Sequence, residues 1–202
     1  CREDYAADAS AFFNAITGCS QALPYRKIEA SPAGLKARLL DLIENEAERQ
    51  RQGGQGLIRA KVNSLSDPDL IQALYKASQA GVEVRLNVRG VCCLRPGLAG
   101  VSERVSVVGI VDRCLEHARI IHFRDGGADR VFISSADWMP RNMERRVELL
   151  VPVEDADCRK RLLAILDTGF QDNVKAWHLK PDGTYVRDEP QGRKKAVRSQ
   201  EF

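Results

Sequence analysis

The stretch that decides the fold is residues 57–88, LIRAKVNSLSDPDLIQALYKASQAGVEVRLNV. It begins with an alternation of apolar and polar residues, as a strand does, and Asp67 followed by Pro68 has the chemistry that opens a helix. That helix is predicted to end at Gly81, and a second strand to run from Val82 to Val88. A strand, a helix and a strand in this order predict a right-handed βαβ unit. We therefore expect an α/β domain with parallel strands and covering helices.

The loop that follows this second strand is the first candidate site. Arg89 opens it, and it continues through Gly- and Pro-containing sequence to Gly100. Ligands of open α/β sheets usually bind outside the carboxyl ends of the strands, which is where this loop lies. Lys61 and Asn63 end the neighbouring strand and could line a phosphate channel beside Arg89. The alternative for Lys61 is a solvated charge at a strand end.

The remaining predicted elements surround this unit. They are a helix over residues 4–18, a strand over Tyr25–Ala30, a long helix capped by Ser31 and opened by Pro32, a strand over 147–153, a helix over 157–170, a hairpin over 174–186 and a polar tail over 193–202.

Composition narrows the class of protein. The chain has 202 residues, 44% of them hydrophobic and 29% charged, which suits one globular domain with peripheral segments. A net charge of +3 does not indicate a nucleic-acid-binding protein, and no apolar run approaches the ~20 residues that span a bilayer. The cysteines form no C-x-x-C pair, so reduced thiols and a cytoplasmic protein are expected, with a peripheral position at the inner membrane left open. The first residue is Cys1, and we expect a segment of a longer chain.

A predicted hairpin over residues 119–134 turns at Asp125-Gly126-Gly127. Reflection through Gly126 places His117 opposite Ser135, because paired residues of an antiparallel hairpin have a constant index sum. Side-chain alternation puts Arg119 on the face of His117, and Asp137 can join Ser135 just after the second strand. These four polar side chains are therefore expected to converge.

Such a group suits phosphoryl chemistry. Histidine can act as a nucleophile or an acid at neutral pH, a cation holds phosphate oxygens, and a hydroxyl and a carboxylate orient the imidazole. The alternative is a structural histidine at the start of a strand. His122 and His178 are expected to be structural or surface residues, and Cys92 and Cys93 to be small packing residues.

Several sequence segments resemble a known family. His117-x-Arg119 followed by SSADW at 134–138 resembles a diverged half of the phospholipase D superfamily motif, in which H-x-K precedes G-S-x-N. The segments KVNSLSDPDLIQALYKASQAGV, VRGVCCLRPG, IVDRCLEHARI and ISSADWMPRNMERRVE resemble the second catalytic domain of bacterial polyphosphate kinases. The resemblance runs from about Phe12 to Tyr185.

This resemblance implies a phospholipase D-like mixed sheet flanked by helices on both faces. It implies a division into residues 1–22, the closing helix of a preceding catalytic domain with its linker, 23–187, the C-terminal catalytic domain, and 188–202, a polar tail. It further implies transfer of the terminal phosphoryl of ATP to polyphosphate, reversibly, through a phosphohistidine on the preceding domain. Nothing in this sequence matches the motif that carries that phosphohistidine, so the chain alone is expected to be inactive.

The resemblance also assigns roles to residues and ligands. His117 becomes the second active-site histidine, Arg89 a phosphate or nucleotide contact, and Arg119 a planar replacement for the superfamily lysine. Mg²⁺ is implied with ATP, its ligands lying on the other domain and none in this chain. Implied partners are ATP or ADP, polyphosphate, the preceding domains and further copies of the full-length chain; nucleic acid is not among them. Arg141 and Asn142 are weaker candidates for holding the polyanion, and surface ion pairs are the alternative.

Two other functions stay open at this point. One is a phospholipase D-like phosphodiesterase that works as a homodimer with one histidine motif per subunit. The other is a polyanion-binding module without activity of its own.

Overall fold

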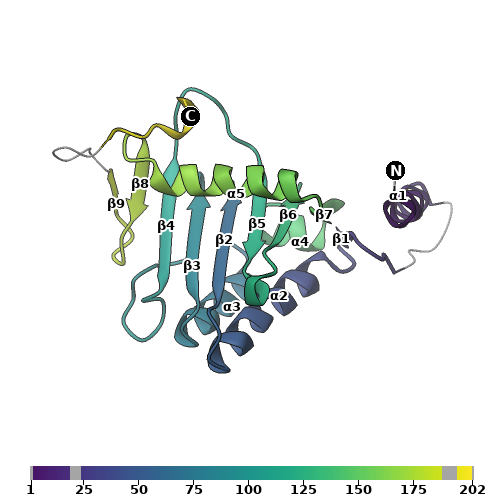
Figure 1. The fold of residues 1–202 in the computed structure, drawn as a ribbon, viewed down its shortest axis with the longest axis horizontal. Helices are drawn as coiled ribbons and strands as arrows, with labels where there is room; N and C mark the ends of the chain where they lie inside the picture. Colours follow the sequence, from purple (N-terminus) through teal and green to yellow (C-terminus); the bar gives the residue numbers. More distant parts are fainter. Residues whose placement is uncertain (1, 19–23, 188–194, 202) are drawn as a thin grey trace.

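A mixed β-sheet forms the centre of the computed structural model, which describes residues 2–18, 24–187 and 195–201 (Figure 1). Its strand order among these residues is β1-β7-β6-β5-β2-β3-β4-β8-β9. The strands are β1 (Glu29–Ser31), β2 (Leu57–Val62), β3 (Glu83–Val88), β4 (Val105–Ile110), β5 (Arg119–Phe123), β6 (Arg130–Ser134), β7 (Glu148–Pro152), β8 (Ala176–Leu179) and β9 (Tyr185–Arg187). β2, β3 and β4 are parallel to one another and the remaining pairs are antiparallel.

Helices cover both faces of the sheet, as predicted. The helix α5 (Ala156–Gln171) crosses one face, and α2 (Leu35–Arg51) and α3 (Pro68–Gln79) pack together on the other (Figure 1). The short α4 (Pro140–Glu144) follows the loop after β6. The first helix, α1 (Glu3–Ile16), lies at the β1 end, where the Asp8 carboxylate accepts hydrogen bonds from the backbone amides of residues 26–28.

The βαβ unit over residues 57–88 is confirmed in detail. Asp67 caps α3 by accepting from the amides of Asp69 and Leu70, both at 3.1 Å, and Pro68 occupies the first turn. β2 and β3 pair in parallel over their whole length. The carboxyl ends of both strands therefore meet at one edge of the sheet, at the top of Figure 1.

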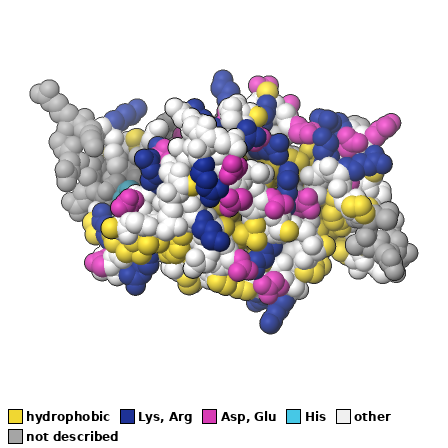
Figure 2. Space-filling model, turned by 90° about the horizontal axis from the view of Figure 1, so that it is seen from below, with side chains coloured by type: hydrophobic (Ala, Val, Ile, Leu, Met, Phe, Trp, Pro, Cys, Tyr) yellow, Lys and Arg dark blue, Asp and Glu magenta, His cyan; other side chains and the backbone are white. Residues whose placement is uncertain are grey.

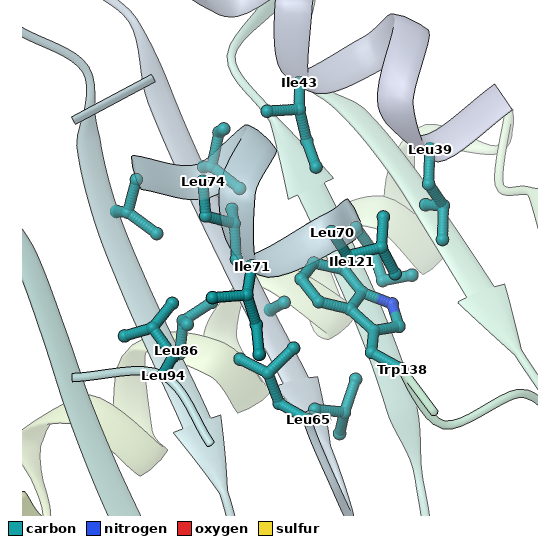
Figure 3. Close-up of a cluster of buried hydrophobic side chains, with 14 of the residues drawn as sticks. Leu39, Ile43, Leu65, Leu70, Ile71, Leu74, Leu86, Leu94, Ile121 and Trp138 are labelled. Carbon is teal, nitrogen blue, oxygen red and sulfur yellow. The ribbon is translucent and has the colours of Figure 1, made fainter. Parts of the chain in front are cut away.

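The hydrophobic core fills the space between the sheet and α2 and α3. Figure 3 shows the indole of Trp138 packed beside Leu70 and Ile121 in this core. Trp138 follows β6 and is fully buried, although the residue before it, Asp137, carries a charged side chain. Its burial anchors the loop after β6 against the core and so fixes the position of Asp137.

Two expectations about the elements were wrong or incomplete. Ser31 does not cap α2: it belongs to β1, pairs with Glu148 of β7 and donates its hydroxyl hydrogen to the Arg146 carbonyl, while Gly34 precedes the helix. Strand pairing between distant residues has overridden a local capping signal. The strand β4, which extends the parallel part of the sheet, was not predicted at all.

The outer surface is mixed in charge. Figure 2 views the molecule from the lower end of Figure 1, away from the carboxyl ends of β2 and β3, and basic and acidic side chains are interspersed there. Among the described residues, no helix is both long and apolar enough to cross a membrane.

Candidate active site

Four chain segments meet at the carboxyl ends of β2 and β3. The Trp138 amide donates to the Ser64 carbonyl at 3.0 Å and the Gly90 amide donates to the Asn63 carbonyl at 2.7 Å. These bonds join the loops after β2, β3 and β6, and the start of β5 completes the site with Arg119. The parallel strands thus bring together residues that are far apart in the sequence.

Asp137 is the centre of the polar network at this edge. Its carboxylate accepts from the Asn63 amide at 2.7 Å and from the Ser64 amide at 3.3 Å. It also accepts two bonds from the Arg119 guanidinium, at 3.1 and 3.0 Å. Burial opposes ionisation of Asp137, but these hydrogen bonds outweigh it and hold its pKa below the usual range. Asp137 is therefore a charged, fully engaged carboxylate at neutral pH.

Arg119 connects this carboxylate to the histidine. Its Nη1 donates to the His117 carbonyl at 2.9 Å, and its two terminal nitrogens lie 3.2 and 3.0 Å from the ring nitrogens of His117. The Arg119 side chain is mostly buried, whereas His117 is exposed. The guanidinium is thus held by Asp137 on one side and fixes the exposed imidazole on the other.

Arg89 joins the network through a neutral partner. Its Nε donates to the Asn63 Oδ1 at 2.8 Å, and a second guanidinium nitrogen donates to the same oxygen. No carboxylate pairs with Arg89 among the residues that the structure describes. Since the Asn63 amide carries no charge, it does not neutralise the positive charge of Arg89.

The prediction that His117 and Ser135 face each other across the hairpin was wrong by one residue. Arg119 pairs with Ser134 across the hairpin, because the turn at 124–129 is longer than a reflection through Gly126 allows. The Ser135 hydroxyl instead donates to Glu148, and it accepts from the Leu149 amide at 3.0 Å. Asn142 donates to the same Glu148 carboxylate at 2.7 Å. Ser135 and Asn142 therefore share a second network that ties β7 to α4.

Two candidate cations differ in their surroundings. Lys61 is buried and pairs with Glu116 at 2.7 Å, beside a cavity of about 340 Å³ between the sheet and α5. Its charge is thereby neutralised on the α5 side of the sheet. Arg141 is exposed at the start of α4 and has no ion pair within the described ranges.

The site also contains residues that sequence reasoning missed. Ser64 contributes a backbone amide to Asp137, which no side-chain pattern could reveal. Glu116 is adjacent to His117 and its partner Lys61 was a candidate, so a search for opposite charges could have paired them. Gln200 binds Glu116 from the far end of the chain and has no signal in the sequence.

The donor set does not fit a divalent metal. Within the described residues, no group of three or more His, Cys, Asp or Glu side chains is placed to hold an ion. Asp137, the carboxylate of the network, is occupied by Arg119 and by backbone amides.

Of the two adjacent thiols, Cys92 packs against the core as predicted, whereas Cys93 is exposed and the packing role predicted for it was wrong. Burial raises the pKa of Cys92 to about 11, so its thiolate is scarce at neutral pH. Cys92, Cys93, Cys114 and Cys158 are all free thiols, and the last three are exposed. His122 is buried, between Arg59 and Asp129.

Comparison with protein families and with individual proteins gives one consistent match. The family model described as "Polyphosphate kinase C-terminal domain 2" matches residues 28–200. A polyphosphate kinase of Rhodopirellula baltica is 56% identical over 201 residues, covering 100% of this chain and 24% of that protein. A polyphosphate kinase of Synechocystis is 46% identical over 200 residues, covering 99% of this chain and 28% of that protein. The chain therefore spans about a quarter of the length of these relatives.

Solved structures agree with this match. The polyphosphate kinase of Porphyromonas gingivalis superposes with a TM-score of 0.95 at 36% identity, covering 99% of this chain and 31% of that one. The phospholipase D family member Nuc of Salmonella typhimurium superposes with a TM-score of 0.54 at 16% identity, covering 80% of this chain and 97% of that one. The second likeness shows the fold alone, and it confirms the predicted phospholipase D-like sheet.

Proposed function

The chain belongs to the polyphosphate kinase family, whose C-terminal domain 2 it contains, and from this premise we propose that it supplies half of a phosphotransferase active site. The reaction is reversible transfer of the terminal phosphoryl group of ATP to inorganic polyphosphate. The relatives are three to four times longer than this chain, so the complete activity is assigned to the longer protein.

One observation carries the proposal. A continuous network runs from Arg89 through Asn63, Asp137 and Arg119 to His117, and it ends in an unpaired guanidinium at one side and an exposed imidazole at the other. Phosphoryl transfer needs cations that hold phosphate oxygens and a group that can move a proton. Both are present at one edge of the sheet.

Each residue then has a distinct role. Arg89 holds phosphate oxygens through a charge-assisted, bidentate contact, because its partner Asn63 fixes it without neutralising it. His117 exchanges a proton with the transferring phosphoryl group or with its leaving oxygen. Arg119 is a positioning residue, since Asp137 and His117 occupy its donors. Arg141 adds an exposed cation at the rim, whereas Lys61, Ser135 and Asn142 maintain the surrounding structure.

The covalent intermediate is assigned to another part of the protein. By family resemblance the phosphorylated histidine lies on the preceding domain, and magnesium arrives with ATP as part of the substrate. The preceding domains and further copies of the full-length chain are proposed partners, and a cytoplasmic location stays a prediction. The phosphodiesterase alternative has only the shared fold in its favour.

A substitution at His117 tests the proposal in a complete polyphosphate kinase that contains this chain. His117→Ala should lower turnover about 10²–10⁴-fold, the usual contribution of a general acid or base, with little change in substrate binding. Acid-labile labelling by γ-labelled ATP should persist, because the nucleophile is elsewhere. His178→Ala in β8, outside the network, is the control. Turnover of the His117 variant within a few fold of the parent would make the histidine structural.

A further inference from the structure

The loop between β4 and β5 carries His117, and it has little backbone support of its own. Residues 111–118 form neither helix nor strand. Residues 113–117 make no backbone-to-backbone hydrogen bond with the part of the chain that the structure describes. Something other than secondary structure must therefore fix the loop, because an imidazole that moves a proton has to be placed within hydrogen-bond reach of the reacting group.

The Gln200 side chain supplies the missing backbone partners. Its Oε1 accepts from the Cys114 amide at 2.8 Å, and its Nε2 donates to the Cys114 carbonyl at 2.9 Å. The same Nε2 donates to the Glu116 carboxylate at 2.8 Å. The Gln200 side chain thus binds the loop at two positions, Cys114 and Glu116, which lie three residues and one residue before His117.

Glu116 extends this attachment to the sheet. Its second carboxylate oxygen pairs with Lys61 of β2 at 2.7 Å. Burial opposes ionisation of Glu116, but the bonds from Lys61 and Gln200 outweigh it and lower its pKa. The residue adjacent to His117 is therefore held as a charged group between Lys61 and Gln200.

A second contact holds the beginning of the loop. The Arg198 guanidinium donates two bonds of 2.7 Å to the Asp112 carboxylate, whose side chain is almost completely buried. Hydrogen bonding from Arg198 lowers the pKa of Asp112 to about 2. Because this folded-state pKa is depressed, the pair is intact at neutral pH and is lost only as the pH falls from about 4 towards 2.

The segment Lys195–Glu201, which contains both contacts, is itself anchored. The Ser199 amide and hydroxyl donate to Asp172 at 2.8 and 2.7 Å, just after α5. Val197 exchanges two bonds with Asn173, its carbonyl accepting from the Asn173 amide and its amide donating to Asn173 Oδ1. The segment therefore connects a fixed point at the end of α5 to the loop that carries His117.

We propose that Gln200 is a positioning residue for His117, acting through the segment Lys195–Glu201 as a clasp on residues 111–118. This inference rests on the proposed function of His117. It assigns a role in the active site to a part of the chain that the sequence presented as a polar tail. Gln200 touches the loop backbone and Glu116, and acts on the reaction only through them.

Gln200→Ala tests the clasp in a complete polyphosphate kinase that contains this chain. Hydrogen exchange should become faster at the Cys114 amide, which loses its acceptor. Turnover should fall about 10- to 100-fold, as a displacement near 1 Å of a catalytic group does, while KM for ATP and polyphosphate changes less than about twofold. Gln79→Ala is the matched control, since Gln79 also binds a backbone carbonyl, that of Gly100, away from the loop.

Two substitutions of Arg198, one severe and one conservative, give a second test of the clasp. Arg198→Ala removes both bonds to Asp112, and Arg198→Lys keeps the charge but loses the planar fork. Partial recovery of turnover in the lysine variant, relative to alanine, is expected if the clasp positions His117. Melting temperatures are measured together with turnover. If parent and variants melt at the same temperature, a loss of turnover reflects lost positioning of His117 and not global destabilisation.

The outcomes distinguish the clasp from the proposed function. Unchanged exchange at Cys114 in Gln200→Ala would overturn the clasp. Faster exchange with unchanged turnover, in an enzyme where His117→Ala is impaired, would overturn the positioning role. If His117→Ala itself retains full turnover, the proposed function fails, and exchange at Cys114 still decides whether the segment holds the loop.

Discussion

Arg89 and Arg119 lie in one hydrogen-bonded network, yet they differ in what neutralises them. Arg119 has a carboxylate partner in Asp137, whereas the oxygen bound by Arg89 belongs to the amide of Asn63. A paired guanidinium orients its neighbours, and an unpaired one attracts anions. We therefore propose different tasks for these two arginines.

This difference gives a prediction for Arg89. In the complete enzyme, Arg89→Ala should raise KM and lower kcat together, with kcat/KM reduced about 10²-fold, because it removes a contact to phosphate oxygens that strengthens in the transition state. Arg89→Lys should recover part of the loss through its charge but not the bidentate geometry. Steady-state kinetics with ATP varied at saturating polyphosphate, and the reverse, measure both parameters.

The control for Arg89 lies on β3, the strand that precedes it. Arg85 is exposed on β3 and pairs with Glu83, so Arg85→Ala should leave both kinetic parameters within about twofold. An Arg89→Ala enzyme with unchanged KM would contradict a binding role for this residue.

At the residue scale, the sequence identified most of the side chains that meet but not how they are paired. His117, Arg119, Asp137, Asn63 and Arg89 were all candidates, because each lies at or near the end of a predicted strand at the same edge of the sheet. Ser135 was expected among them and instead binds Glu148. The pairing of Arg119 with Asp137 was not predicted, since it depends on the turn length at 124–129 and on the burial of Trp138. Such distances are set by packing, which a local pattern does not contain.

Some helices and strands follow from local sequence signals, whereas others depend on contacts between residues that are far apart in the sequence. The start of α3 follows from Asp67 and Pro68, and the hairpin of β5 and β6 follows from its Asp-Gly-Gly turn, where Gly126 and Gly127 take positive φ values of 66° and 100°. β1 was misplaced because its bounds depend on pairing with β7, more than a hundred residues later. The segment at 195–201 binds the loop at 111–118 for equally non-local reasons.

The cap of α3 allows a stability prediction at this scale. Asp67→Ala should lower the free energy of unfolding by about 1–3 kcal/mol, because the buried carboxylate caps the helix and also lies 3.0 Å from Lys36. Urea unfolding followed by circular dichroism measures the change. Asp69→Ala is the matched control: Asp69 is exposed, also pairs with Lys36 and accepts no capping bond from the described residues, so we expect a loss below about 1 kcal/mol. Equal losses in the two variants would refute the capping role.

At the scale of the whole molecule, the proposed function makes this chain one part of a divided active site. It superposes almost completely on a polyphosphate kinase structure, yet covers 31% of that protein. The network at the sheet edge provides an uncompensated guanidinium and an imidazole, but among the described residues it lacks a carboxylate group suited to a metal. We therefore expect residues 1–202 alone to bind a polyanion without carrying out the covalent step of the reaction.

The separation can be tested with the isolated polypeptide of residues 1–202. Incubated with γ-labelled ATP, magnesium and polyphosphate, it should form no acid-labile phosphohistidine and extend no chain, because a transfer through a covalent intermediate cannot start without its nucleophile. Of the three histidines in the sequence, His122 is buried, His178 lies in β8 outside the network, and His117 is assigned to proton transfer. Binding of labelled polyphosphate should nevertheless be measurable by filter retention, should weaken with added salt, and should fall in Arg89→Ala but not in Arg85→Ala. Label on His117 would instead make that histidine the nucleophile. Polyphosphate binding that is equal in both arginine variants would show that general surface charge, and not the unpaired Arg89, attracts the polyanion.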